Sequence, residues 1–191
     1  MVDADKVLSF WLDEVGPKDW YATDDALDSR IRDLFLTTWS EATEGALGLW
    51  LTYPRGALAY IILTDQFPRN MFRGSARAFE TDANALAAAK ISIDRKWDLR
   101  IAEPARQFFY LPLMHSENLC DQERCVRLMH ERMPETGASN LLHAKAHREV
   151  IRLFGRFPYR NDALSRPFTA PERDYVADGG YGETVRQLQA V

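Results

Sequence analysis

Cysteine is scarce in this chain of 191 residues, which contains only Cys120 and Cys125. On a helix, positions five apart point about 140° away from each other, so these thiols are not expected to form a disulfide. Without a CxxC spacing they also provide no ligand framework for a metal. The absence of a disulfide framework is typical of a reducing compartment, and we expect a cytoplasmic location.

Long apolar runs and an excess of positive charge are absent as well. No window approaches about 18 apolar residues, so no helix is expected to span a membrane. The first residues, MVDADKVLSF, include acids where a signal peptide has basic residues. The net charge of −4 argues against nucleic-acid binding, which usually requires a basic field. We therefore expect a soluble protein that binds neither membranes nor nucleic acids.

The common catalytic and cofactor motifs are also missing. The sequence has no GxSxG, no P-loop and no GxGxxG, and no cofactor is expected. His143 and His147 have the i, i+4 spacing of zinc-binding helices, but Ala-Lys-Ala stands between them and the glutamate of HExxH is absent. On a helical wheel both histidines share the face of Val150 and Ile151. We expect them at the edge of the core and expect no metal site.

Helical periodicity dominates the pattern that remains. Apolar residues of 24–42 recur at helical spacing, and Asp24 or Thr23 can cap the start of this helix. No alternating pattern of useful length predicts a strand. Further helices are expected at 56–66, 76–94, from 104 across Pro112, 119–133 and 139–154, with a short last helix that begins at a capping box, Thr169–Glu172. The sequence thus predicts an all-α fold of about eight helices with antiparallel neighbours.

One domain is the default for a chain of this length, so residues 1–191 are expected to form a single domain. Residues 176–191, which include DGGYGE, are expected to form a loosely ordered tail. The helix at 56–66 is apolar nearly all round, which predicts a central and buried position. Pro68 is expected to end it, because the residue before a proline is driven out of the α region.

Two short phrases share Phe-Pro and Arg-Asn: DQFPRN at 65–70 and GRFPYRN at 155–161. Both stand in cationic segments whose cations are all arginine: Arg69, Arg73 and Arg77 against Asp65 in 65–77, and Arg152, Arg156, Arg160 and Arg166 against Asp162 in 152–166. Arginine binds carboxylate and phosphate bidentately, so the two segments would form an anion site if they met at one seam. The alternative is structural, since arginine after a helix end can satisfy carbonyls and pair with nearby acids.

The stretch LPLMHSEN at 111–118 places His115 and Glu117 just after an aromatic-rich apolar helix. A histidine beside a carboxylate can relay protons. One histidine and one glutamate do not form a metal site. The alternative is again structural, with His115 neutral, partly buried and hydrogen-bonded near a helix end.

Four separated blocks together resemble the signature of a bacterial family. They are FW at 10–11, LTDQFPRNMFRG at 63–74, FFYLPLMHSE at 108–117 with DQ at 121–122, and FGRFPYRN at 154–161. The family is a domain of unknown function, numbered 924, and the resemblance covers about residues 7–175. It implies a tetratricopeptide-like all-α fold, here an antiparallel helical array, and it implies no established activity.

The sequence leaves two kinds of function open, and whether the protein is an enzyme stays undecided. As a binding module, it would hold an anionic small molecule or a peptide terminus with Arg69, Asn70, Arg73, Arg156, Arg160 and Asn161. As an enzyme, it would use Asp65, His115 and Glu117 for acid–base chemistry on an anionic substrate. A third interpretation is that these groups only hold the fold together. The oligomeric state is not predicted.

Overall fold

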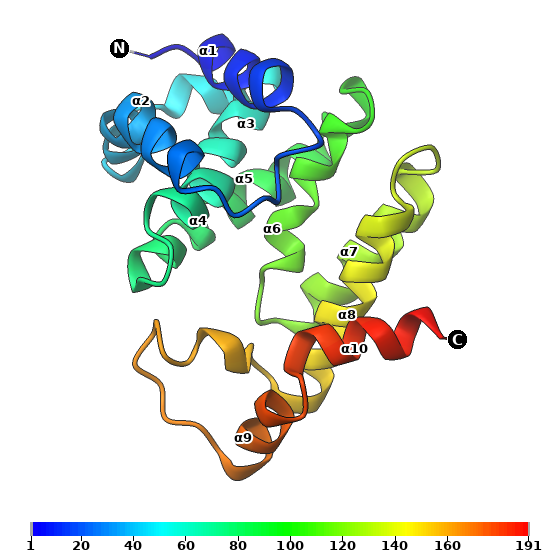
Figure 1. Cartoon of the computed structure of the whole chain (residues 1–191). Helices are drawn as coiled ribbons and strands as arrows, with labels where there is room; N and C mark the ends of the chain where they lie inside the picture. The colour runs from blue at the N-terminus through cyan, green and yellow to red at the C-terminus, as the bar shows by residue number, and fades with distance from the viewer. Residues whose placement is uncertain (1, 191) are drawn as a thin grey trace. The chain divides into compact units, whose positions relative to one another are not determined.

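The computed structural model describes residues 2–190, and within that range it contains helices and no strand (Figure 1). The all-α fold class predicted from the sequence is therefore confirmed. The chain divides into two compact units, the first ending at Pro112 and the second beginning at Leu113. The single domain expected from the chain length and the tetratricopeptide-like arrangement both stay predictions.

The first unit is built from short α-helices joined by 3₁₀ and π-helical segments. Its α-helices are α1 (Ala4–Leu8), α2 (Asp25–Thr43), α3 (Pro54–Ile61), α4 (Phe67–Met71) and α5 (Asp82–Asp94), and α6 (Leu111–Met114) contains the boundary. The π-helical segments are Ser9–Val15 and Ile62–Gln66, and the 3₁₀ segments are Gly48–Thr52, Ala76–Phe79, Asp98–Arg100 and Ala105–Phe109. Helix α3 contacts both α1 and α5, which makes it the central helix of this unit.

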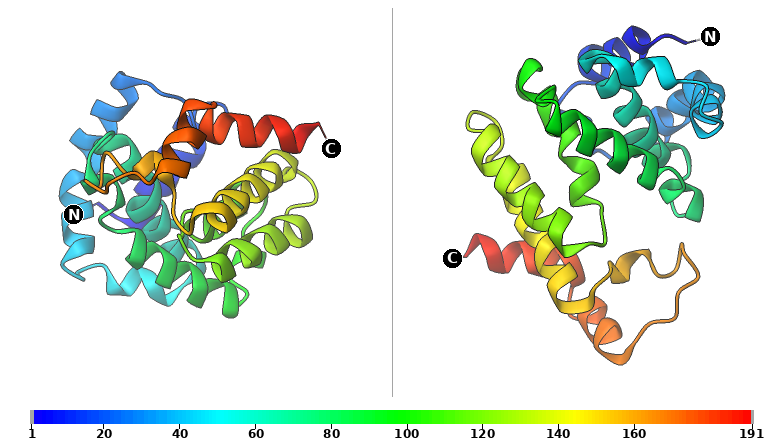
Figure 2. Two further views of the ribbon diagram at one scale, coloured as in Figure 1. Left: turned by 90° about the horizontal axis from the view of Figure 1, so that it is seen from below. Right: turned by 180° about the vertical axis from the view of Figure 1, so that it is seen from behind.

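The second unit consists of α7 (Leu119–Arg132), α8 (Ala138–Phe154), a 3₁₀ turn (Pro158–Arg160), α9 (Ala170–Ala177) and α10 (Gly180–Gln189). Helices α7 and α8 lie side by side as an antiparallel pair, and α10 packs on α8 in the views of Figure 2. The predicted ends of these helices are close to the observed ones: Gly155 adopts the left-handed conformation that ends α8, and Thr169 forms a capping box with Glu172.

Aromatic rings form the core of the first unit. The ring of Phe67 lies 4.8 Å from that of Phe35, 5.4 Å from Trp11 and 6.0 Å from Phe10, measured between ring centroids. All four side chains are buried, with Phe67 and Phe35 at 0% exposure. Offset and edge-to-face pairs of this kind add to the stabilisation that comes from burial alone. The first Phe-Pro phrase therefore supplies a central core residue.

The buried run that starts in α3 continues beyond the predicted end. Every residue from Gly56 to Pro68 is buried, which confirms the central position expected for 56–66. The prediction that Phe67-Pro68 ends the helix is wrong, because Phe67 keeps α-helical angles (φ −60°, ψ −36°) and opens α4. The π-helical segment before it places Pro68 in the first turn of α4, where the N–H that proline lacks is not required by the helix.

The second phrase adopts a different backbone. Phe157 is extended (φ −92°, ψ 106°) and leads into a 3₁₀ turn, although Phe157 is as fully buried as Phe67. The left-handed Gly155 ends α8 two residues earlier, so the chain leaves the helix before the proline. The two Phe-Pro sequences therefore both bury their phenylalanine, but they adopt different backbone conformations.

Two further segments differ from the sequence expectation. The helix predicted over 76–94 is divided, because Thr81 interrupts it: its hydroxyl donates to the carbonyl of Thr64 (2.6 Å) and accepts from the indole of Trp39 (3.1 Å). The tail at 176–191, expected to be loosely ordered, contains α10. Tyr181 joins α10 to α8, since its hydroxyl lies 2.7 Å from Nδ1 of His143.

Ile62 lies in the middle of the buried run and has 0% exposure. Replacing it by alanine removes buried methyl groups and leaves a cavity, so Ile62→Ala should lower the free energy of unfolding by about 2–5 kcal/mol. In a protein of this size each kcal/mol lowers the melting temperature by about 2–4 °C, which a thermal melt detects.

The control for this prediction is Leu49→Ala, because Leu49 is 80% exposed. It should change the melting temperature little. Equal melting temperatures for the Ile62→Ala and Leu49→Ala variants would contradict the central position of this segment.

Candidate functional site

The arginines of the first phrase are engaged within the first unit. Arg69 donates to the backbone carbonyl of Ala78 and to the carboxylate of Asp82, with 2.9 Å between Nη2 and Oδ2. Its guanidinium carbon also lies 4.8 Å from the centroid of the Phe79 ring. Arg69 therefore connects the end of α4 with the start of α5. This agrees with the interpretation that the arginine satisfies carbonyls and pairs with nearby acids.

Arg73 and Asn70 bind one carboxylate together. Arg73 donates to Asp28 through Nε (2.7 Å) and Nη2 (2.9 Å), and Asn70 donates to the same group at 2.8 Å. Burial alone would raise the pKa of Asp28, but the hydrogen bonds from Arg73 and Asn70 outweigh burial and hold this pKa below its ordinary value. Asp28 thus stays ionised and fixes α2 against the loop after α4.

A polar pocket opens beside this pair. We call it the arginine pocket; its volume is about 490 Å³, and it is lined by Asp25, Asp28, Ser29, Arg32, Asn70, Met71, Arg73 and Gly74. Arg32 donates to the carbonyl of Met71 through Nε and Nη2. The side chain of Arg73 remains 42% exposed although it pairs with Asp28. Two arginines therefore line one solvent-accessible hollow within the first unit.

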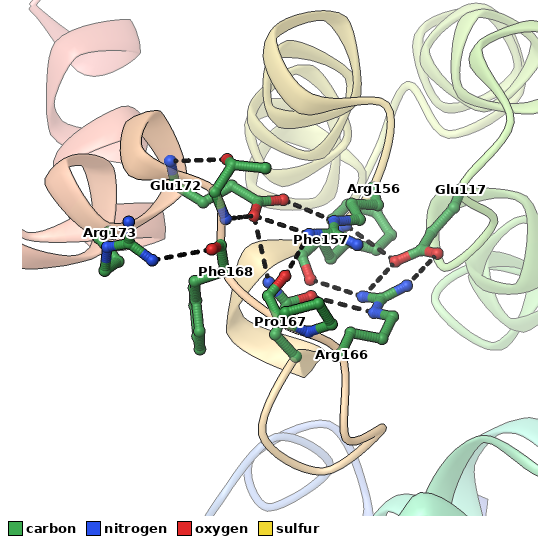
Figure 3. A network of polar contacts seen from close by, with 10 residues as sticks. Glu117, Arg156, Phe157, Arg166, Pro167, Phe168, Glu172 and Arg173 are labelled. Atoms are coloured by element: carbon green, nitrogen blue, oxygen red, sulfur yellow. Dashed lines mark hydrogen bonds and ion pairs between the residues drawn. The ribbon is translucent and has the colours of Figure 1, made fainter.

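The second phrase anchors α9 (Figure 3). Arg156 donates to Glu172 through Nε (2.5 Å) and Nη2 (2.8 Å), and Nη2 also donates to the carbonyl of Pro167 at 2.8 Å. Glu172 accepts a further bond from the backbone N–H of Thr169 (2.7 Å). The hydrogen bonds from Arg156 are the largest of the effects that lower the pKa of Glu172 to about 2. Glu172 is ionised in the folded protein at every physiological pH.

Glu117 organises the other half of this network. Arg166 donates to both of its carboxylate oxygens, at 2.7 and 3.0 Å, and the backbone N–H of Phe157 donates to Oε1 at 2.8 Å (Figure 3). Burial acts to raise the pKa of Glu117, but the bonds from Arg166 and Phe157 outweigh it and lower this pKa. Arg166 also donates to Asn161 at 3.0 Å. Glu117 thus holds the second phrase in place as an ionised carboxylate.

Arg160 is nearly enclosed by the second unit. It is 6% exposed, and its guanidinium carbon lies 4.6 Å from the centroid of the Phe157 ring. Asn161 is fully buried and lies 3.5 Å from Glu172. Of the predicted ligand-binding residues in this phrase, Arg156, Arg160 and Asn161, each is therefore occupied by contacts inside the unit.

The histidines gather on one side of α8. Nδ1 of His147 donates to the carbonyl of His143 (2.8 Å) and lies 3.0 Å from the hydroxyl of Tyr181. The ring of His115, which is half-buried as predicted, lies 6.4 Å from the ring of His147. Burial is the largest of the effects that lower the pKa of His147 to about 3, and the positive charge of Arg160 acts in the same direction. His147 is therefore neutral and structural, as expected for a core-edge residue.

The three residues of the enzyme hypothesis are not brought together within either unit. Asp65 belongs to the first unit, where its side chain is 1% exposed and accepts from the amide of Gln66. His115 and Glu117 belong to the second unit. Their joint acid–base role stays a prediction. Within the second unit, the pairing of Glu117 with Arg166 favours a positioning role for this carboxylate.

Sequence reasoning missed the partners that occupy the arginines. Asp28 stands 45 residues before Arg73, and nothing in its local pattern distinguishes it from the other acids of α2. Arg32, which lines the arginine pocket, also lies on the polar side of a helix. Glu172 was identifiable only as the last residue of a capping box. A helix cap can be recognised from a local sequence motif, whereas an ion pair between residues far apart in the sequence leaves no local pattern.

Among residues 2–190, no three side chains of His, Cys, Asp or Glu are grouped closely enough to hold a metal ion. No described helix has the length and apolar character needed to cross a membrane.

Comparisons with known proteins give a family without an activity. The model of the family described as bacterial protein of unknown function (DUF924) matches residues 7–180. A solved structure described as protein of unknown function ATU0120 from Agrobacterium tumefaciens is similar, with 38% sequence identity and a TM-score of 0.85. The match covers 92% of this chain and 97% of that one. No curated protein matches the sequence.

The lowered pKa of His147 predicts how stability depends on pH. A histidine in the unfolded chain protonates near pH 6.5, whereas His147 in the folded protein protonates near pH 3. Between these values the unfolded chain binds more protons, so the contribution of His147 is complete above about pH 6.5 and is lost as pH falls through 3. The loss should approach about 1.4 kcal/mol per pH unit in this window.

The variant His147→Gln removes this titration, so its stability should fall less steeply between pH 6.5 and 4.5, measured by urea unfolding. Below about pH 4.5 the lowered pKa values of Glu117 and Glu172 add their own loss in both proteins. His130→Gln is the control, because His130 is exposed on α7. A wild-type slope in the His147→Gln protein would show that His147 does not resist protonation.

Proposed function

Since the chain belongs to DUF924, a bacterial family of unknown function, we propose its function from the geometry of its own side chains: it is a binding protein for a small anionic molecule or a peptide terminus. The observation that carries this proposal is the arginine pocket, in which Arg32 and Arg73 line one hollow and Arg73 is 42% exposed. Concave sites with a few convergent polar groups are the common form of small-molecule sites.

Arg32 and Arg73 each have a hydrogen-bond donor that no other described residue uses, which favours a ligand that carries hydrogen-bond acceptors. Arg73 uses Nε and Nη2 for Asp28, and Arg32 uses the same two nitrogens for Met71. Within residues 2–190, no hydrogen bond engages Nη1 of either side chain. Arginine has five N–H donors in a planar fork, so each group can bind a second acceptor without releasing the first. A carboxylate placed between the two groups would accept from both.

The charges of the residues that line the arginine pocket limit the class of ligand that it can bind. Asp25 and Asp28 balance the charges of Arg32 and Arg73, so the arginine pocket has no net formal charge. A polyanion such as pyrophosphate would be repelled by the exposed Asp25, whereas a single carboxylate needs only the two arginine donors. An ammonium group on the same ligand would be attracted to Asp25. The lining therefore favours a free amino acid or a short peptide with a free carboxylate over a phosphate ester.

The role of the second phrase in this function stays a prediction. Within the second unit, Arg156, Arg160 and Asn161 are engaged by Glu172, Phe157 and their neighbours. If the two segments 65–77 and 152–166 form one seam, exposed Tyr159 should contribute to binding, and Tyr159→Ala should weaken it. If the first unit binds alone, this variant should bind as the wild type does.

The proposal is tested by ligand-induced thermal stabilisation and calorimetry with glycylglycine, acetate and pyrophosphate. The dipeptide should stabilise the protein by about 2.7 kcal/mol at a hundred times its dissociation constant, and pyrophosphate should stabilise it less. Arg73→Lys keeps a charge near Asp28 but loses the planar fork, so it should weaken dipeptide binding at least about tenfold, as should Arg32→Gln.

Arg30→Gln is the matched control, because Arg30 is an exposed arginine of α2 that pairs with Glu14 outside the arginine pocket. It should bind the dipeptide with the wild-type affinity. The proposal fails if millimolar dipeptide and acetate leave the melting temperature unchanged, or if Arg73→Lys and Arg32→Gln bind as tightly as Arg30→Gln.

A further inference from the structure

A second pocket lies in the first unit, where α3 packs against α5. We call it the apolar pocket; its volume is about 290 Å³, and most of its lining is hydrophobic, including Leu51, Tyr60, Ala87, Ile91 and Trp97, with Arg95 among its polar groups. It shares no lining residue with the arginine pocket. Its volume is near the lower end of small-molecule sites, which run from roughly 300 to 1,000 Å³, so its occupant must be small.

Small side chains on the facing helices account for this hollow. Ala57 of α3 and Ala87 and Ala88 of α5 all line it. Alanine lets helices approach closely, but it fills little of the space between them when larger neighbours hold the backbones apart. Ile91, one turn after Ala87, is 51% exposed at the same pocket. The surface therefore offers apolar area that the fold itself does not cover.

Tyr60 places an unused polar group in this apolar lining. The residue is 6% exposed, and no other described residue hydrogen-bonds to its hydroxyl, although its carbonyl accepts from Thr64. The hydroxyl itself is not among the fully buried polar atoms of the described residues, so it remains open at the pocket. The phenol is therefore a donor available to an occupant of the pocket.

Arg95 is a second unused donor in the same lining. Its guanidinium carbon lies 4.9 Å from the centroid of the Trp97 ring, and no carboxylate pairs with it among residues 2–190. This distinguishes Arg95 from Arg69, Arg73 and Arg156, which all pair with acids. The cation–π contact holds the charge at the apolar pocket without neutralising it.

We propose that the apolar pocket binds a small monocarboxylic acid with an apolar chain. The chain would cover Leu51, Ile91 and the alanines, and the carboxylate would accept hydrogen bonds from Arg95 and Tyr60. Burial of the chain supplies most of the affinity, and the charged bond to Arg95 selects the acid over neutral analogues. A free short-chain acid and the C-terminal residue of an apolar peptide share this chemistry, and the probes below distinguish them.

The test is isothermal titration calorimetry of the full chain with hexanoate, with N-acetyl-leucine as the mimic of a peptide end, and with hexanamide as the neutral control. One of the two acids should bind at least tenfold more tightly than hexanamide, and the tighter acid identifies the source. Arg95→Gln should remove this preference, and Tyr60→Phe should weaken acid binding several-fold. Arg100→Gln, a change at a nearby exposed arginine, should leave it unchanged.

Two further variants keep the inference falsifiable. Ala87→Leu fills the hollow from an exposed helix position, so it should abolish acid binding while the melting temperature stays near that of the wild type. The titrations are repeated in a protein that carries Arg73→Lys and Arg32→Gln, so that acid bound in the arginine pocket does not contribute and the remaining binding reports on the apolar pocket. The inference is overturned if neither acid binds this protein more tightly than hexanamide, or if adding Ala87→Leu or Arg95→Gln to it leaves acid binding unchanged.

Discussion

The ionised carboxylates that bind arginines from distant parts of the chain are the interactions on which each unit depends. Asp28 accepts from Arg73 and Asn70, and Glu172 accepts from Arg156 and the start of α9. Each carboxylate is mostly buried, so losing its arginine would leave an uncompensated charge, which costs more than the bond itself contributes. The irregular segments that follow α4 and α8 are thereby fixed to α2 and α9.

This pairing explains why arginine, and never lysine, fills the two cationic segments. Arg166 serves Glu117, Asn161 and the carbonyl of Phe157 at once, and a lysine could not present donors in that fixed plane. The sequence feature that suggested an anion site was therefore largely an internal one. Of the predicted residues, Arg73 keeps a donor that no internal acceptor uses, and so does Arg32, which the sequence did not single out.

The helices could be predicted where local physical chemistry decides them. The capping residue Asp24, the apolar run after Pro54 and the left-handed Gly155 all act within one turn of chain, and the structure agrees with each. Predictions failed where a residue distant in the sequence determines the local backbone conformation. A π-helical segment, buried under the aromatic core, carries the helix through Pro68, and Thr81 divides a helix because Trp39 and Thr64 bind its hydroxyl. Similarly, the site lacks a local signal, since Asp28 and Arg73 meet only in the fold.

The contrast between paired and unpaired arginines provides a physical criterion for function in this protein. A guanidinium that is paired with a buried acid, such as Arg156 with Glu172, can be removed only at the expense of the fold. Arg95 has no such acid, and its exposed guanidinium lies against the ring of Trp97 at the apolar pocket. Removing this charge would therefore cost the unit no ion pair. A ligand carboxylate would supply the missing partner, which is why the unpaired cation, rather than the arginine-rich phrase, points most directly to an external molecule.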